Sequence, residues 1–428
     1  MALDQEPGGL EPFPGPGSNN LPLSLAAAAA VMSRRPADGY RWRYEDGLVL
    51  LAIREAGLRK ARPDLVDFSR RAVERLVSPD GSIEGYRRDE YNLDQVNPGK
   101  LLFDLRDRSG DQRYAKAIAA LAGQLRTQPR TPSGGFWHKG IYPNQMWLDG
   151  LYMAAPFYLR LCLGGEADAG APAAAVARDG AGAAAAFGRP GDVVRQFGLA
   201  EAHCLDHSTG LLRHAWDEAR LQPWADPETG RSPHAWGRAM GWFAMALVDC
   251  LCLARDACVG YADGVGRAGG PAGPDGTGPD AGTDTAALET SLAGMLRRLA
   301  EAVSHNVDQS TGLAWQVMDR PGDEGNYLEC SASCMFVYAF AKGAALGVLE
   351  PRFLEAARKA WGSIRERFVA AGEDGLLSLG GICQVAGLGG QPYRDGSYRY
   401  YLSEPVVRDD YKGLGPFILA ALEMEELS

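Results

Sequence analysis

The chain has 428 residues, of which 46 % are apolar, 23 % charged and 9 % aromatic. This is the composition of a globular protein with a sizeable core, and the length suits one large domain or about two to three ordinary ones. The 54 acidic residues outnumber the 44 basic ones, which gives a net charge of −10 and argues against nucleic acid or an anionic membrane as a partner. No apolar run reaches the about 18 residues of a membrane-spanning helix.

The N-terminal segment is rich in Pro and Gly, and we expect residues 1–20 to be a disordered lead before a first helix over 21–33. Residues 21–32 are apolar and Ala-rich, but the segment before them contains three acidic residues and no Lys or Arg. A secretory signal needs a positive n-region, so we expect a cytoplasmic protein. None of the eight Cys residues forms C-x-x-C or has zinc spacing, and reduced thiols fit a cytosolic chain.

Apolar residues recur at helical spacing along most of the chain. Strand signals are few and short, so the sequence predicts an all-α protein with small β pieces in its loops. Two segments, 164–191 and 260–284, are rich in Gly with Ala, Pro or Asp, and they hold too few large apolar residues to offset the entropy of ordering them. We expect surface insertions there. The predicted later helices are 44–59, 66–76, 99–107, 112–126, 145–163, 192–204, 236–255, 287–304, 329–348, 351–369 and 413–427.

A weak internal repeat organises these helices. Asp206-His-Ser-Thr-Gly-Leu211 recurs as Asp308-Gln-Ser-Thr-Gly-Leu313, with looser versions at 79–83 and 373–377. Asp, Ser, Thr and Gly are turn formers, and repeated helix–turn–helix units indicate helical hairpins stacked side by side. Six hairpins closed into an (α/α)6 barrel would use residues 21–428 as a single domain, whereas an open solenoid is the competing arrangement.

The densest run of chemically active side chains lies between residues 134 and 153. A loop leads into a helix predicted to begin near Asn144, with Asp149 about one turn inside it. Neighbouring Met, Trp and Leu side chains would desolvate this carboxyl and favour its protonated form, as a general acid near neutral pH requires. The alternative is a solvated Asp on a polar helix face. The loop itself contributes Trp137, His138, Lys139 and Tyr142.

A second carboxylate, Asp94, precedes the helix predicted at 99–107 and either serves catalysis or only caps a turn. Arg238 and Trp242 are four residues apart near the start of another helix, so they share a face. A guanidinium beside Trp rings suits a ligand carboxylate, with which it forms bidentate pairs; the alternative is a surface Arg stacked on core aromatics.

Other patches carry weaker signals. The segments 315–319, 326–333, 380–384, 392–398 and 409–417 include loops rich in Tyr, Gly and hydroxyl groups, which commonly bind sugars through ring stacking and fixed hydrogen bonds. Cys330 and Cys334 are spaced to share a helix face, and we interpret them as small buried core residues rather than a functional thiol pair.

Together, the run around Asp149, the His214-Ala-Trp-Asp217 element, the segment from Trp236 to Trp242 and the block 409–417 resemble the unsaturated glucuronyl and rhamnogalacturonyl hydrolases, glycoside hydrolase families 88 and 105. Family 105 is the closer match. The resemblance covers roughly residues 40–425 apart from the two insertions. Its most specific pieces are Tyr142-Pro-Asn-Gln-Met-Trp-Leu-Asp-Gly150 and the pair Arg238 and Trp242.

The resemblance implies an (α/α)6 barrel and removal of a 4,5-unsaturated uronic acid from the non-reducing end of lyase-derived oligosaccharides, with an unsaturated rhamnogalacturonan disaccharide as the expected substrate. In this reaction Asp149 protonates the vinyl ether double bond and water adds to it, with Asp94 assisting; no cofactor or metal is needed. Implied substrate-binding residues are His138, Lys139, His214, Arg238, Trp242 and Tyr44. One departure is Ala239-Met240, where other members resemble Arg-Gly-Asn-Gly; we expect this loop edge to tune the subsite of the leaving sugar.

Two alternatives remain open from the sequence. A sugar epimerase or isomerase on the same barrel would rely on paired histidines, but His138, His214 and His234 lie in separate motifs. A helical-repeat binding scaffold would present a long open groove. The expected partner is a small oligosaccharide with an unsaturated uronic acid, not nucleic acid or a membrane, and we expect a monomer or weak homo-oligomer.

Overall fold

The computed structural model describes residues 21–166, 187–262 and 281–427. The expected lead over 1–20 lies outside these residues, as do 167–186 and 263–280, which form most of the two expected insertions. The helices of the described chain are α1 (Leu23–Arg34), α2 (Tyr44–Arg59), α3 (Pro63–Glu74), α4 (Lys100–Ser109), α5 (Gln112–Thr127), α6 (Leu148–Leu163), α7 (Pro190–Cys204), α8 (Gly237–Ala262), α9 (Ala281–Asn306), α10 (Cys330–Ala345), α11 (Pro351–Phe368), α12 (Tyr398–Ser403) and α13 (Tyr411–Glu426).

These helices form two concentric rings, and the predicted all-α barrel is confirmed. The inner ring runs α2, the 3-10 helix Leu93–Gly99 with its continuation α4, then α6, α8, α10 and α13, and it closes because α13 packs against α2. The inner helices α10 and α13 are buried nearly all round, as a ring enclosed by a second one requires. Helices α3, α5, α7, α9 and α11 each pack outside the inner helix that precedes them.

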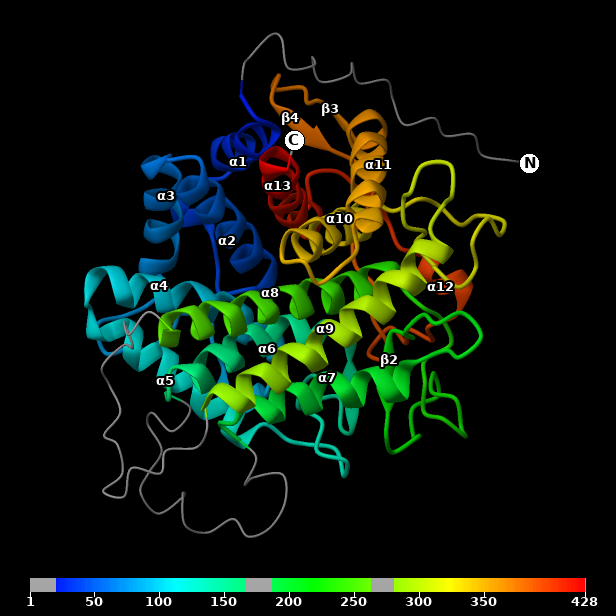
Figure 1. The fold of residues 1–428 in the computed structure, drawn as a ribbon, viewed down its shortest axis with the longest axis horizontal. Coiled ribbons are helices and arrows are strands. Elements are labelled where there is room, and N and C mark those ends of the chain that lie inside the picture. Colours follow the sequence, from blue (N-terminus) through cyan, green and yellow to red (C-terminus); the bar gives the residue numbers. More distant parts are fainter. Residues whose placement is uncertain (1–20, 167–186, 263–280, 428) are drawn as a thin grey trace.

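The sixth hairpin is made by the two ends of the described chain. Helix α1 packs against α13 and α2, and Figure 1 shows α1 (blue) beside α13 (red). Ser24 anchors the contact, because its backbone N and its Oγ both donate to the Glu425 carboxylate, at 2.9 and 2.7 Å. Five hairpins are therefore consecutive in sequence, and the sixth closes the barrel.

The repeated turns adopt one conformation. Asp206 Oδ1 accepts from the Ser208 hydroxyl and Asp308 Oδ1 from the Ser310 hydroxyl, and the backbone carbonyls of the two Asp residues accept from Gly210 N and Gly312 N. Gly210 and Gly312, the glycines of the two copies, both have φ of +75°, a conformation that glycine adopts at little cost. The prediction that each copy forms a turn after a helix is confirmed, and in the structure both of these helices, α7 and α9, belong to the outer ring.

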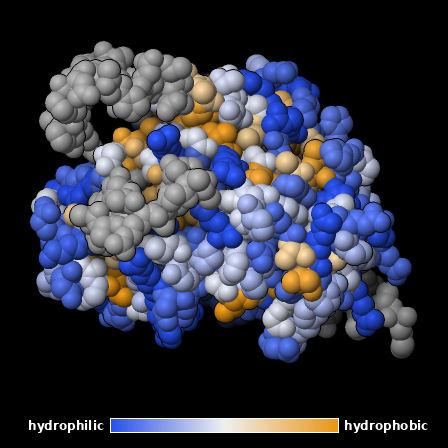
Figure 2. All heavy atoms as spheres, turned by 90° about the horizontal axis from the view of Figure 1, so that it is seen from below, coloured by the Kyte–Doolittle hydropathy of each residue, from blue (hydrophilic) through white to orange (hydrophobic). Residues whose placement is uncertain are grey.

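The barrel interior is apolar and its surface is not. The view from below in Figure 2 shows a mainly hydrophilic face with small, separate apolar patches. The segment Gly237–Asp256 of α8 is long and apolar enough to cross a membrane by length and composition, but 83 % of it is buried inside the protein, as for the core helix of a barrel. Cys330 and Cys334 are also fully buried, which confirms their interpretation as core residues.

Short strands connect the loops at one end of the barrel. They form three antiparallel pairs: β1 (Gln145–Trp147) with β2 (Ala215–Asp217), β3 (Val369–Ala371) with β4 (Leu377–Leu379), and β5 (Ile382–Cys383) with β6 (Val406–Val407). The helix predicted to start near Asn144 was therefore wrong in its first residues. Asn144 has φ of +58°, and the chain then runs as β1 before α6 begins at Leu148.

Candidate active site

The first turn of α6 carries Asp149, the candidate acid. Because α6 starts at Leu148, Asp149 is its second residue rather than one turn inside. The Leu148 backbone N donates to the carbonyl of His214 at 3.1 Å, so β2 and the start of α6 are held together. The Asp149 side chain is 14 % exposed, and its Oδ2 lies 3.2 Å from Nε2 of His214, without the alignment of a hydrogen bond. An acid–imidazole pair thus forms at this end of the barrel.

The His214 ring is enclosed and oriented by aromatic neighbours. It is fully buried, and Trp147 and Trp236 lie at ring-centroid distances of 5.3 and 4.8 Å. Its Nδ1 lies 2.8 Å from the hydroxyl of Tyr401 on α12. This contact fixes the orientation of the imidazole, so that Nε2 points toward Asp149. Sequence reasoning missed Tyr401, which lies just beyond the segment 392–398, because no local pattern distinguishes it from the neighbouring tyrosines.

Asp94 lies in the 3-10 helix Leu93–Gly99, and it is not the residue that caps this turn. That role belongs to Asn92, whose side chain accepts from the Asp94 backbone N. The Asp94 carboxylate instead lies 2.6 Å from Nζ of Lys139 and 3.6 Å from Nε2 of His138. Burial raises the pKa of this carboxyl, but the charge and hydrogen bond of Lys139, together with the charge that His138 carries at acid pH, outweigh burial and hold the pKa below its ordinary value. Asp94 is therefore an ionised group at neutral pH.

His138 packs between the Asp94 pair and the aromatic wall. It is 3 % exposed, and its ring stacks on Trp147 at a centroid distance of 4.8 Å. Burial lowers the pKa of His138 to about 4, so the imidazole is neutral at neutral pH. A Cβ at Gly150 would lie 3.0 Å from His138 Nδ1, which explains why glycine follows Asp149 here.

Tyr44, at the start of α2, lies within electrostatic range of Asp94, Asp149 and Arg238. Burial raises the pKa of Tyr44 well above its ordinary value, and the charges of Asp94, Arg238 and Asp149 all act on its hydroxyl. Groups from four elements of the barrel therefore converge on one region. His138 and His214 converge there too, since both contact the ring of Trp147.

Arg238 is enclosed rather than exposed. It is fully buried, its guanidinium lies 5.1 Å from the ring of Trp236, and its Nη2 donates to the carbonyl of Cys383. Its Nε and Nη1 have no hydrogen-bond partner among the described residues. Because buried polar groups are rarely left unpaired, these two donors are available to an acceptor that the described residues do not supply.

Trp242 is a buried packing partner of Tyr44. It is 1 % exposed and packs between Tyr44 and Tyr152, at centroid distances of 6.3 and 4.8 Å. The expectation for the departure at Ala239-Met240 was wrong: both residues are fully buried inside α8 and form no loop edge. Their identity follows from core packing.

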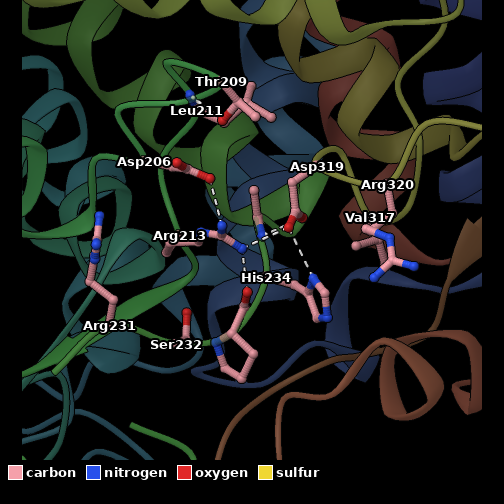
Figure 3. Close-up of polar contacts among 12 residues, drawn as sticks. Asp206, Thr209, Leu211, Arg213, Arg231, Ser232, His234, Val317, Asp319 and Arg320 are labelled. Atoms are coloured by element: carbon pink, nitrogen blue, oxygen red, sulfur yellow. Dashed lines mark hydrogen bonds and ion pairs between the residues drawn. The ribbon is translucent and has the colours of Figure 1, made fainter. Parts of the chain in front are cut away.

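A second polar cluster, missed by sequence reasoning, ties the loop that carries His214 to the loop that leads into α8 and Arg238. Asp319 Oδ2 accepts from Arg213 Nη1 at 2.6 Å and lies 3.0 Å from Nδ1 of His234. Arg213 also donates to Asp206, so one guanidinium bridges two carboxylates, as Figure 3 shows. Arg213 directly precedes His214, so this cluster anchors the strand on the side opposite the site.

Comparison with known proteins agrees with this arrangement. Residues 28–164 and 190–428 match the model of Glycosyl Hydrolase Family 88. The structure superposes on a family 105 glycoside hydrolase from C. acetobutylicum with a TM-score of 0.79 and 36 % identity, covering 95 % of this chain and 100 % of that one.

Two curated relatives cover part of the chain. Protein Atu3128 of Agrobacterium fabrum is 41 % identical over 54 % of this chain and 89 % of its own length. The unsaturated rhamnogalacturonyl hydrolase YesR of Bacillus subtilis is 26 % identical over 50 % of this chain and 54 % of its own length. Families 88 and 105 are glycoside hydrolases, which removes the epimerase and binding-scaffold alternatives. The chain belongs to glycosyl hydrolase family 88 and is a glycoside hydrolase of the family 88 and 105 type.

Proposed function

We propose that this chain removes the 4,5-unsaturated uronic acid from the non-reducing end of lyase-derived oligosaccharides, and that an unsaturated rhamnogalacturonan disaccharide is its substrate. The observation that carries the proposal is that the ring of Trp236 lies against two groups, His214 and Arg238. His214 is the partner of the nearly buried acid Asp149, and Arg238 is a buried guanidinium with two unpaired donor atoms. A uronate offers a carboxylate for the guanidinium, and its double bond offers a carbon for the proton. The name of YesR supports rhamnogalacturonan as the source.

The proposed reaction begins with proton transfer from Asp149 to C4 of the double bond. Positive charge then develops on C5 and the ring oxygen, where the ionised Asp149 stabilises it. Water adds at C5 and gives up a proton to the same carboxylate, and the resulting hemiketal opens to a keto acid as the leaving sugar is released. Asp94, ionised beside Lys139, orients the substrate hydroxyls.

The other predicted substrate-binding residues position the acid or line the region around it. His214 holds Asp149 in position from 3.2 Å, and the neutral His138 adds a polar edge without adding charge. The charges of both carboxylates act on the Tyr44 hydroxyl, and the ring of Trp242 packs against the Tyr44 ring.

The test follows the ultraviolet absorbance of the conjugated double bond. Incubation with a lyase-made rhamnogalacturonan disaccharide should abolish this absorbance, and Asp149→Asn should reduce the rate by about 10³-fold or more. Asp323→Asn is the matched control, because Asp323 forms an exposed ion pair with Arg320 and should leave the rate unchanged. Persistence of the absorbance with every pectin- or glycosaminoglycan-derived unsaturated disaccharide would refute the proposal.

We further propose a cytoplasmic enzyme that is a monomer or weak homo-oligomer and acts on small oligosaccharides. Cell fractionation and size-exclusion chromatography over a range of concentrations test the two statements. Recovery in the secreted fraction, or a stable large oligomer, would contradict them.

A further inference from the structure

The segment 326–333, singled out in the sequence, places a second charge beside Arg238. Its member Glu329 is fully buried, like the guanidinium. Two buried charges are costly unless each is compensated. Glu329 is among the groups whose charges raise the pKa of Arg238 against the opposing effect of burial, after the Cys383 thiol. The two side chains therefore compensate one another electrostatically.

Glu329 does not bind the guanidinium directly, because other donors occupy its carboxylate. Its Oε2 accepts from the Ala332 backbone N at 2.7 Å, its Oε1 accepts from the Cys383 backbone N at 2.9 Å, and the Ser331 hydroxyl lies 2.8 Å from both oxygens. The first of these bonds caps α10. The second holds the residue whose carbonyl accepts from Arg238.

The main chain of Cys383 thus links the two charges. Its N–H donates to the Glu329 carboxylate, and its C=O accepts from the Arg238 guanidinium. This link fixes Nη2 of the guanidinium and leaves Nε and Nη1 without partners. We infer that Glu329 is a positioning residue that keeps the Arg238 guanidinium compensated in charge yet free to bind the carboxylate of an unsaturated uronate. The inference rests on the proposed function and adds to it the residue that sets the preference for an acidic sugar.

Removal of the Glu329 charge would redirect the Arg238 guanidinium. The region also holds Asp94, Asp149 and Asp410, whose charges act on Tyr44 or on Arg238 itself. A buried guanidinium without compensation would turn toward one of these carboxylates, because an unpaired buried charge costs far more than a paired one. The two free donors would then be occupied, and the uronate would lose its partner.

The experiment compares two substrates: the unsaturated disaccharide with a free uronate and the same disaccharide with that carboxyl methyl-esterified. The wild type should prefer the acid in kcat/KM by about tenfold or more, because charge-assisted bonds exceed neutral ones. Glu329→Gln keeps the side-chain shape and should bring this ratio close to one, mainly through a higher KM for the acid. Ser331→Ala is the matched control; it removes a donor from the same carboxylate but leaves its charge and its bond to Cys383, so the preference should persist.

A merely structural role of Glu329 would lower the rates for acid and ester alike. An unchanged or larger preference in the Glu329→Gln variant would therefore overturn the inference. If that variant does not fold, Glu329→Asp keeps the charge but withdraws it from the Cys383 N–H, and it should lose part of the preference; full retention would also refute the inference. Failure of the wild type to consume either substrate would instead refute the proposed function.

Discussion

Replacement of His138 by Gln should remove a specific part of the protein's sensitivity to acid. Burial holds the pKa of His138 at about 4, below its ordinary value of 6.5. As pH falls below 6.5, His138 becomes protonated in the unfolded chain, whereas in the folded protein it stays neutral until about pH 4. The free energy of unfolding therefore decreases over this interval. One pKa unit corresponds to about 1.4 kcal/mol, so the full loss is about 3 kcal/mol, of which about 2 kcal/mol has occurred by about pH 4.5.

Urea denaturation of wild type and His138→Gln at about pH 7 and pH 4.5 measures this difference. At pH 7 the variant should be less stable by about 1 kcal/mol, because it loses the stacking of the imidazole on Trp147. Between the two pH values the wild type should lose about 2 kcal/mol more than the variant. His305→Asn, which removes an imidazole from an exposed helix end, controls for the loss of a histidine and should follow the wild type. Equal pH dependence in wild type and His138→Gln would refute the reasoning.

Three other substitutions test how neighbouring residues set the pKa of Asp94, the position of His138 and the pH dependence of stability. Lys139→Met removes the cation that counters burial at Asp94; the pKa of Asp94 should rise, and the acid limb of the pH–rate profile should move to higher pH. Gly150→Ala would place a Cβ 3.0 Å from His138 Nδ1, and displacement of that ring should lower kcat/KM by about tenfold with little change in Tm. Burial lowers the pKa of Lys100 to about 7, so wild-type stability should rise as pH increases from 7 toward 10, and Lys100→Met should flatten that rise in urea titrations.

The helices were predictable because their signal is local. The spacing of apolar residues gave the bounds of α2 exactly where the structure has them, Tyr44–Arg59, and Asp-x-Ser-Thr-Gly marked turns whose hydrogen bonds lie within a few residues. The closure of the helical ring, by contrast, depends on contacts between residues that are far apart in the sequence. The contact between α1 and α13 joins the two ends of the described chain, and no spacing within either helix predicts it.

The start of α6 illustrates the same limit at the site. Gln145-Met146-Trp147 continues the apolar pattern of the helix that follows it, and a short apolar run cannot be assigned to helix or strand by periodicity alone. Its hydrogen-bonding partner, β2, is distant in sequence, and that pairing decided the conformation. The shift matters for chemistry, because it moves Asp149 into the first helical turn and brings it to His214.

Residues that would contact a ligand are easier to identify from a sequence than the residues that position them. Asp149 and Arg238 stood out because a charge among aromatic and apolar residues needs an explanation. Glu329 precedes a helix with Ser331 close behind, and it does cap that helix, so its local pattern is fully explained by capping. Its bond to the Cys383 N–H depends on where a distant loop lies, and only the folded chain shows that the same carboxylate also serves the guanidinium.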